Sequence, residues 1–380
     1  MPPLVYGNRV PLYRQIAQAL RQRVRTGVYA AGRPLPPLRA LAAEYGVSIY
    51  AIQKAIYELE KERAVVTHHG RGIMVMAEKP CDQAAILFGM IEPYEHFMGF
   101  ESQIIWVAEK VFDQRNDFMV TRSSEGRAQQ ERAIAEHYVK NGVKGIILWP
   151  VENDPNGPFF TELAKTVPVV IIDRDVKDCS VPKVFYDLIQ AGRNFGQCLL
   201  GQMRRRRLLV LMDTLDISPY HDFMAGLRQA AAQLGRGADV IVHPVPTSEL
   251  SRHFSAGDFS RVPKLAAKIE KWLRAEGCDA VFCYQDEFVD YVLLETGVAD
   301  RMPELQLATM APLSVYRRSQ KFNQSHVLTG LQDQSRLIQT AANLLQDAVY
   351  ARLQPKNVPP IRLELAKDGK KITFPGHEMV

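Results

Sequence analysis

A group of side chains in the first fifth of the sequence has the types and spacing that suit contact with a polyanion. Arginine can hold a guanine or a phosphate through two parallel hydrogen bonds, and glutamine can read an adenine. Glycine lets a backbone approach a sugar-phosphate chain closely. The candidates for such contacts are Arg39, Ser48, Tyr50, Gln53, Lys54, His69, Gly70 and Arg71.

A second group lies directly after predicted strands in the rest of the sequence. A carboxylate can accept hydrogen bonds from two hydroxyls of a sugar, and an aromatic ring can stack on the apolar face of a sugar. The candidates for this site are Tyr94, Arg122, Trp149, Arg174, Phe223 and Asp286. Simpler interpretations stay open: the aromatic residues could belong to a core, and Asp286 could be the N-cap of a helix.

Residues for catalysis or for a cofactor are not arranged in a recognisable pattern. The sequence has no glycine-rich phosphate loop, no HExxH motif and no GxSxG elbow. The five cysteines are odd in number and scattered, without a CxxC pair, which argues against a disulfide framework or a zinc site. We therefore expect neither an enzyme nor a bound metal or other cofactor.

The charge is unevenly distributed along the 380 residues. Residues 1–80 hold 12 Lys and Arg against 5 Asp and Glu, whereas the remaining residues hold 35 against 37. A basic small domain joined to a near-neutral large one suggests a polyanionic partner for the small domain alone. No apolar run approaches the roughly 18 residues of a membrane helix, and the N-terminus lacks the apolar segment of a signal peptide. We expect a soluble cytoplasmic protein of two or three domains without a membrane partner.

The first 76 residues are predicted to form a helix-turn-helix domain with a wing. Apolar residues recur every four positions in 11–27, and Gly46 separates a short helix at 38–45 from a second helix that starts at the N-cap Ser48 and runs to about residue 62. Two β-prone runs, at 64–68 and 73–76, flank a basic glycine-rich tip. The second helix would enter the major groove, while the first helix and the wing hold phosphates.

Residues 77–83 are predicted to be a linker, and residues 84–380 an α/β domain with two similar lobes. Short apolar runs alternate there with helical segments, which is typical of parallel sheets covered on both faces. The predicted strands are 84–90, 117–121, 143–149, 167–172, 208–212, 239–243, 280–284, 305–310 and 361–365. The predicted helices are 100–114, 127–141, 158–165, 188–203, 220–234, 259–276, 287–296 and 335–353. Ligands of such folds bind at the carboxyl ends of the strands, where the second group of candidates lies.

Specific residues of the first 76 positions carry a family resemblance. They are the string PLYRQIAQALRQRV, Gly32, Leu35-Pro36, Arg39, Leu41-Ala42, Gly46-Val47-Ser48, Ala55, Leu59 and Gly70-Arg71-Gly72. This segment resembles the winged-helix domain of GntR-type transcription regulators, which implies DNA binding and makes Arg39 a DNA-contacting arginine. The chain departs from the family at Ile49 and Gln53, where arginines are usual, and at Pro37, where a serine cap is common. The departures imply an operator different from the common one.

A weaker but collinear resemblance covers the rest of the chain. Its carriers are Val143-Lys144-Gly145-Ile146-Ile147 before Pro150, the run from Val167 to Arg174, Tyr186-Asp187, Gly226, Gln285-Asp286 and Leu328-Thr329. This part is similar to the sensor domain of LacI-type repressors, itself similar to periplasmic sugar-binding proteins. The resemblance implies that Asp286 is an effector-binding carboxylate, whereas Phe223 stands where the family often has arginine. The combined layout resembles the arabinose-repressor subgroup.

These observations predict a winged helix-turn-helix domain followed by a two-lobed, periplasmic-binding-protein-like domain with parallel sheets. We expect a homodimeric repressor of a double-stranded DNA operator, controlled by a small carbohydrate bound between the lobes. Alternatively, the C-terminal domain is a dimerisation scaffold without an effector, an interpretation that Phe223 motivates. The run Arg204–Arg207 is either a nucleic-acid patch or, as we expect, the solvated end of a helix.

Overall fold

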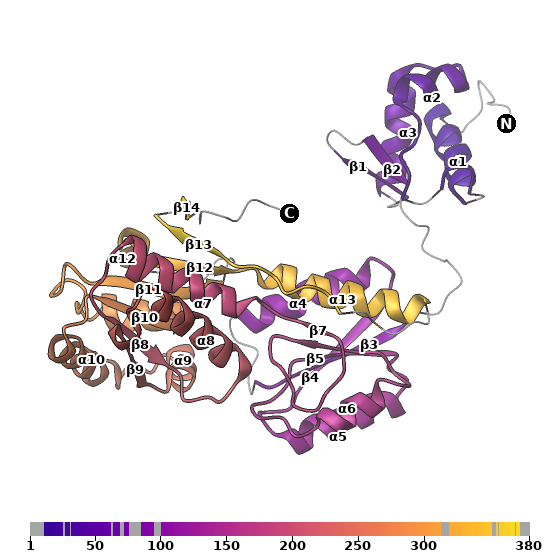
Figure 1. Ribbon diagram of the computed structural model, residues 1–380. Coiled ribbons are helices and arrows are strands. Elements are labelled where there is room, and N and C mark those ends of the chain that lie inside the picture. The colour runs from indigo at the N-terminus through magenta and orange to yellow at the C-terminus, as the bar shows by residue number, and fades with distance from the viewer. Residues whose placement is uncertain are drawn as a thin grey trace. The chain divides into compact units, whose positions relative to one another are not determined.

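The computed structural model describes residues 11–25, 27–30, 32–61, 64–68, 72–75, 85–94, 100–312, 319–351, 355, 357–368 and 370–372. The chain divides into two compact units, Met1–Ala84 and Ala85–Val380 (Figure 1). The predicted fold class is confirmed, because a helix-turn-helix with a small antiparallel sheet precedes two α/β lobes. Among the described residues, no helix is long and apolar enough to cross a membrane.

The small unit is built around a helical core. Its elements are α1 (Leu12–Arg25), α2 (Leu38–Tyr45), α3 (Ile49–Lys61), β1 (Val65–His68) and β2 (Gly72–Val75). The apolar stripe predicted for the first helix is buried, since Ile16 and Leu20 are fully buried and pack in one cluster with Leu41, Ile52 and Leu59. The strands β1 and β2 pair antiparallel, as expected for a wing.

The turn between α2 and α3 depends on two residues. Gly46 has φ of 64°, in the left-handed region that favours glycine, and its N–H bonds to carbonyls in the last turn of α2. The Ser48 Oγ accepts a hydrogen bond from the Ala51 amide at 3.2 Å, so the predicted N-cap is confirmed. The cap sets where α3 begins and therefore which residues occupy its first turn.

The first lobe of the large unit has a five-stranded parallel sheet in the order β4-β3-β5-β6-β7. Its strands are β3 (Leu87–Glu92), β4 (Phe118–Ser123), β5 (Gly145–Leu148), β6 (Val169–Ile172) and β7 (Lys183–Val184). Its helices include α4 (Phe100–Asp113), α5 (Ala128–Lys140) and α6 (Gly157–Leu163). Every residue of β5 and β6 is buried, because helices cover both faces of a parallel sheet. The strand β7 was not predicted, since two residues are too short to show a pattern.

The second lobe has a seven-stranded sheet in the order β14-β13-β12-β11-β10-β8-β9. Its strands are β8 (Leu208–Met212), β9 (Val240–Pro244), β10 (Ala280–Gln285), β11 (Gln306–Pro312), β12 (Leu328–Gln332), β13 (Glu364–Lys367) and β14 (Lys370–Ile372). Its helices include α7 (Leu188–Gly196), α8 (Ser218–Gln233), α9 (Thr247–Ser255), α10 (Val262–Glu276), α11 (Asp286–Phe288) and α12 (Gln320–Gln324). The sheet is mixed rather than wholly parallel, because β13 pairs antiparallel with both β12 and β14. The elements β12, β14, α9 and α12 were not predicted.

The helix α13 (Gln334–Ala351) links the lobes. It follows β12 of the second lobe but packs on α4 of the first lobe (Figure 1). The buried Asp117 accepts hydrogen bonds from Gln346 Nε2 at 2.6 Å and from Tyr350 Oη at 2.8 Å. The helix is therefore part of the first lobe, although the sequence on both sides of it belongs to the second.

Candidate functional sites

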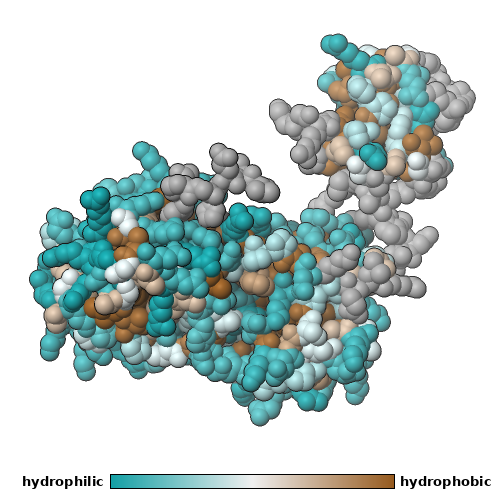
Figure 2. Space-filling model, viewed as in Figure 1, coloured by the Kyte–Doolittle hydropathy of each residue, from teal (hydrophilic) through white to brown (hydrophobic). Residues whose placement is uncertain are grey.

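The exposed face of α3 carries most of the predicted DNA contacts. Ile52 and Leu59 turn into the core with 0% of their surface exposed. The opposite face presents the exposed side chains Ile49, Tyr50, Gln53, Lys54 and Tyr57. Figure 2 shows hydrophobic as well as hydrophilic residues on the surface of the small unit. On α3, Ile49 is 41% exposed and Tyr50 is 64% exposed, so this helix has a mixed apolar and polar surface.

Lys54 is held at the side of α3. Its Nζ lies 4.9 Å from the centre of the Tyr50 ring and 5.7 Å from the centre of the Tyr13 ring on α1. Aromatic faces attract a cation at these distances. The charge is therefore positioned between α3 and α1, which suits a phosphate contact better than a base contact.

The arginines of the small unit have different roles. Arg39 lies exposed in the first turn of α2, where it can reach a ligand. Arg23 of α1, in contrast, donates from Nη1 to Tyr29 Oη at 2.9 Å and forms an ion pair with Glu44 of α2, so it holds the fold together. The predicted contacts at 69–71 (His69, Gly70 and Arg71) lie outside the described residues.

A largely buried group of polar and aromatic side chains lies near the carboxyl ends of strands from both lobes. We name this group the interlobe cluster. Its members are Tyr94, Trp149, Asp173, Arg174, Tyr186, Tyr220 and Tyr284. Three of the predicted effector contacts, Tyr94, Trp149 and Arg174, are thus brought together.

Arg174 is the centre of the first-lobe part of the cluster. Its Nη1 donates to the Pro150 carbonyl at 3.0 Å and its Nη2 donates to Tyr94 Oη at 3.0 Å. Its Nε lies 3.7 Å from Asp173 Oδ2, which also accepts from Trp149 Nε1 at 3.0 Å. Burial raises the pKa of Asp173, although the adjacent arginine acts in the opposite direction. The guanidinium therefore orients a carboxylate and two aromatic rings at once.

Tyr220 and Tyr284 belong to the second lobe. Their rings meet edge to face with centroids 4.8 Å apart, and Gln285 Nε2 donates to Tyr220 Oη at 3.0 Å. The pKa of Tyr284 is raised by burial first and then by the carboxylate of Asp173 in the first lobe. Groups of the two lobes are thus close enough to interact electrostatically.

Two buried polar atoms of the cluster have no hydrogen-bond partner among the described residues. They are the Nε of Arg174, which is 7% exposed, and the hydroxyl of Tyr186, which is 3% exposed. A buried polar group without a partner costs about 1–3 kcal/mol. A molecule with several oxygen atoms could satisfy both groups, and the neighbouring rings could stack on its carbon skeleton.

Two loops of the first lobe contact the second lobe beside the cluster. The Asp216 amide donates to Glu152 Oε1 at 2.6 Å, and Asn153 Nδ2 donates to Asp216 Oδ2 at 3.2 Å. The Asp175 amide donates to Ser218 Oγ at 2.7 Å. The lobes are therefore in contact at the border of the cluster.

A buried carboxyl group supports the loop that carries Glu152. Glu131 is 0% exposed and accepts hydrogen bonds from the Val151 amide at 3.0 Å and from Asn156 Nδ2 at 3.2 Å. Burial and, next, the neighbouring carboxyl group of Asp154 raise the pKa of Glu131 to about 9. The surroundings of Glu131 therefore favour its protonated form.

Phe223 differs from its predicted role. The structure places it in the core, 0% exposed and stacked on Phe282 with centroids 4.4 Å apart. The reason is the close crossing of α7 and α8, since a Cβ at Gly226 would lie 1.9 Å from the Ile189 carbonyl oxygen. Residues three apart share a helix face, so Phe223 points into the core with Gly226. It supports the cluster only indirectly, behind Tyr284.

Arg122 and Asp286 lie in different surroundings. Arg122 is exposed on β4, which is the edge strand of its sheet. Asp286 is 8% exposed and is the first residue of α11, whereas Gln285 occupies the N-cap position. Its interpretation as an N-cap is therefore wrong by one residue, and Gln285 is the residue that contacts Tyr220.

Four members of the cluster were not predicted: Asp173, Tyr186, Tyr220 and Tyr284. Asp173 directly follows β6, so the rule that selected Arg174 could have found it, whereas Tyr186 lies two residues after β7, a strand that was not predicted. Tyr284 lies within β10, and Tyr220 lies in the first turn of α8. No local pattern indicates that these last two tyrosines meet the first lobe.

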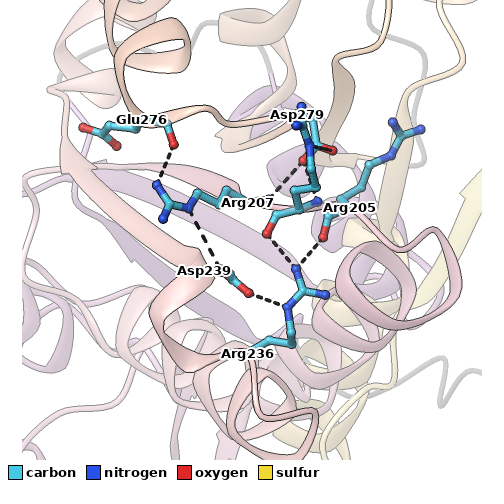
Figure 3. A network of polar contacts seen from close by, with 7 residues as sticks. Arg205, Arg207, Arg236, Asp239, Glu276 and Asp279 are labelled. Atoms are coloured by element: carbon cyan, nitrogen blue, oxygen red, sulfur yellow. Dashed lines mark hydrogen bonds and ion pairs between the residues drawn. The ribbon is translucent and has the colours of Figure 1, made fainter.

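Arg205 and Arg207 of the run 204–207 belong to a network of polar contacts with Arg236, Asp239, Glu276 and Asp279, shown in Figure 3. The amides of Arg206 and Arg207 donate to Asp279 Oδ1 at 2.7 and 3.0 Å. Arg236 Nη2 donates to the Arg206 carbonyl at 2.7 Å. These contacts anchor the start of β8 to the loop before β10.

Comparisons with known proteins match both units. Residues 12–75 match the gntR family of bacterial regulatory proteins, and residues 93–308 match the periplasmic binding protein domain. The arabinose metabolism transcriptional repressor of Geobacillus stearothermophilus is 23% identical over 291 residues, which covers 75% of this chain and 77% of that protein.

Two solved structures show the same fold as the large unit. The Caulobacter myo-inositol binding protein bound to myo-inositol has a TM-score of 0.61 at 14% identity, covering 76% of this chain and 95% of the other. The Cra transcriptional dual regulator from Pseudomonas putida, in complex with fructose 1-phosphate, has a TM-score of 0.57 at 16% identity, covering 74% and 98%.

The exposed helix-turn-helix and the two-lobed domain therefore agree with the families that match them. Such chains are regulators and not enzymes. The chain belongs to the periplasmic binding protein domain family, carries a DNA-binding domain of the gntR family at its N-terminus, and is a transcription regulator.

Proposed function

We propose that the protein is a homodimeric repressor that releases its operator when a neutral carbohydrate binds in the interlobe cluster. The observation that carries this proposal is a pair of buried groups, Arg174 Nε and the Tyr186 hydroxyl, that have no hydrogen-bond partner among the described residues. The names of similar proteins support it: one relative is an arabinose metabolism repressor, and one structural neighbour holds myo-inositol.

The DNA contacts that we propose lie on α2, α3 and the wing. Arg39 and Gln53 are exposed and can reach bases or phosphates, Lys54 is positioned for a phosphate, and Tyr50 lies beside it. Ser48 acts by capping α3. His69, Gly70 and Arg71 complete the proposed set. Two copies would present two reading helices to half-sites about one helical turn apart, and chromosomal DNA as partner implies the cytoplasm.

The charge of the cluster favours a neutral effector. Arg174 is its only cationic member, and Asp173 lies beside it. A phosphorylated sugar would bring a charge of about −2, for which the cluster has no further cation. An unphosphorylated sugar or cyclic polyol could instead accept from Arg174 and Tyr186 and stack on Trp149.

Effector binding would act through the relative population of two lobe arrangements. A ligand bound to Arg174 and Tyr186 of the first lobe that also contacts Tyr220 or Tyr284 of the second lobe would favour the arrangement in which Glu152 and Asn153 meet Asp216. If this arrangement binds the operator more weakly, the operator must weaken effector binding by the same factor.

Fluorescence anisotropy of a labelled operator duplex tests the proposal. The probes are arabinose, xylose, myo-inositol and fructose 1-phosphate, with Arg174→Ala as the test variant and Arg122→Ala as the matched control. We expect one neutral compound to raise the operator Kd for the wild type and for the control, and not for Arg174→Ala. If no compound changes the operator Kd, and Arg174→Ala behaves as the wild type, the C-terminal domain is a scaffold without an effector.

A further inference from the structure

The exposed face of α3, opposite the core, has a composition that favours particular base pairs. The helix sequence IYAIQKAIYELEK contains no arginine. Ile49, Gln53 and Tyr57 are exposed and four residues apart, so they form one line along the face opposite the core. In a helix-turn-helix, the N-terminal residues of the second helix contact base edges. Ile49 and Gln53 are therefore the members of this line that meet bases first.

The neighbouring polar groups at this end of α3 are already engaged. The Ser48 Oγ accepts from the Ala51 amide at 3.2 Å, which caps the helix. The Lys54 Nζ lies over the rings of Tyr50 and Tyr13 at 4.9 and 5.7 Å. Neither group belongs to the line of Ile49, Gln53 and Tyr57, and the Tyr57 hydroxyl lies further along the helix, so the Gln53 amide is the first hydrogen-bonding group that this line offers to bases.

The chemistry of these two side chains matches an A·T pair. Arginine and lysine suit the two acceptors of guanine, whereas the amide of glutamine donates to N7 and accepts from N6 of adenine. Ile49 is 41% exposed at the start of the helix. The thymine methyl is the apolar group that bases present in the major groove, so an exposed isoleucine gains most by packing on it.

We propose that Ile49 and Gln53 determine specificity by selecting A·T pairs in each operator half-site, with Gln53 on adenine and Ile49 on a thymine methyl. This inference rests on the proposed function, because it names the base pairs that the same DNA site reads. Arg39 and the basic charge of the small unit supply affinity that does not depend on these two residues.

Selection from a random duplex pool with the full chain is the first experiment. We expect an inverted repeat with A·T pairs where α3 reads. Repeating the selection with Gln53→Arg should replace one A·T pair by G·C in each half-site. The wild type and Gln53→Arg should each bind the site that it selected about tenfold more tightly than the site selected by the other protein. Gln18→Arg, which adds the same charge at an exposed position of α1, should leave the selected sequence unchanged.

A single-methyl substitution tests Ile49. Replacing the contacted thymine by uracil removes one methyl group, which should weaken wild-type binding about fourfold. Ile49→Ala should bind both duplexes equally. The two protein variants, Gln53→Arg and Ile49→Ala, change exposed positions. Unchanged far-UV circular dichroism of each variant would show that the small unit is still folded.

The outcomes separate this inference from the proposed function. If the wild type selects a repeat with G·C at the position that Gln53→Arg alters, the inference alone is overturned. The same holds if Ile49→Ala still binds the thymine duplex more tightly than the uracil duplex. Equal retention of all sequences by the wild type overturns sequence-specific regulation itself and this inference with it.

Discussion

The two candidate sites differ in how their side chains are held. On α2 and α3 the proposed contacts, such as Arg39 and Gln53, are exposed. In the interlobe cluster, Arg174 is 7% exposed, donates two hydrogen bonds and forms an ion pair with Asp173. We therefore expect arginine to be replaceable without loss of stability in the first site, and its replacement to destabilise the second. Exposure decides whether function and folding can be separated by mutation.

The largest effect is expected when Arg174 is replaced by methionine. The change removes two hydrogen bonds and leaves Asp173 buried without its cation, which should lower the free energy of unfolding by about 3 kcal/mol. Urea unfolding followed by tryptophan fluorescence measures this, because Trp106, Trp149 and Trp272 all belong to the large unit. Arg122→Met, at an exposed position, should change it by less than about 0.5 kcal/mol. Equal losses in both variants would show that the burial of Arg174 does not set its contribution to stability.

The pH dependence of the large unit should be the next largest effect. The pKa of Glu131 is about 9 in the folded chain against 4.5 for an ordinary glutamate, so unfolding releases a proton between these values. Stability therefore falls as pH rises, by about 1.4 kcal/mol per unit, or about 2 kcal/mol between about pH 7 and 8.5. Glu131→Gln should flatten this slope in urea unfolding at several pH values. A slope identical to that of the wild type would contradict the role of Glu131.

Arg39→Ala should affect DNA binding alone. We expect a roughly tenfold loss of operator affinity, corresponding to about 1.4 kcal/mol, with the unfolding free energy unchanged. Anisotropy titrations at fixed salt, with specific and unrelated duplexes, show whether the arginine contacts a base or a phosphate. Arg132→Ala, at an exposed position of the large unit, serves as the control. A change in stability as large as that of Arg174→Met would show that Arg39 also has a structural role.

The smallest effect is expected at the cap of α3. Ser48→Ala removes the acceptor for the Ala51 amide and should destabilise the small unit by about 1 kcal/mol. Ser48→Asp keeps a cap acceptor but adds a negative charge near DNA, so it should retain stability and lose operator affinity. Thermal melting by circular dichroism and anisotropy measure the two properties. If both variants melt alike and below the wild type, capping is not what Ser48 contributes.

The interlobe cluster was predicted only in part. Trp149 and Arg174 were identified because a residue directly after a parallel strand lies at the ligand-binding edge of the sheet. The same rule selected Phe223, which the structure places in the core, since the rule does not specify how the following helix is rotated. Gly226 sets this rotation, because α7 and α8 cross too closely for a side chain there.

The sequence by itself determined the helix-turn-helix, its cap at Ser48 and its turn at Gly46. These depend on contacts within a few residues and on φ angles that glycine adopts. Only the tertiary structure decided that Asp173 and Arg174 of one lobe lie near Tyr220 and Tyr284 of the other. The physical reason is distance along the chain: groups from separate lobes come together only when packing of both sheets and of α13 has positioned them, and no local pattern encodes that packing.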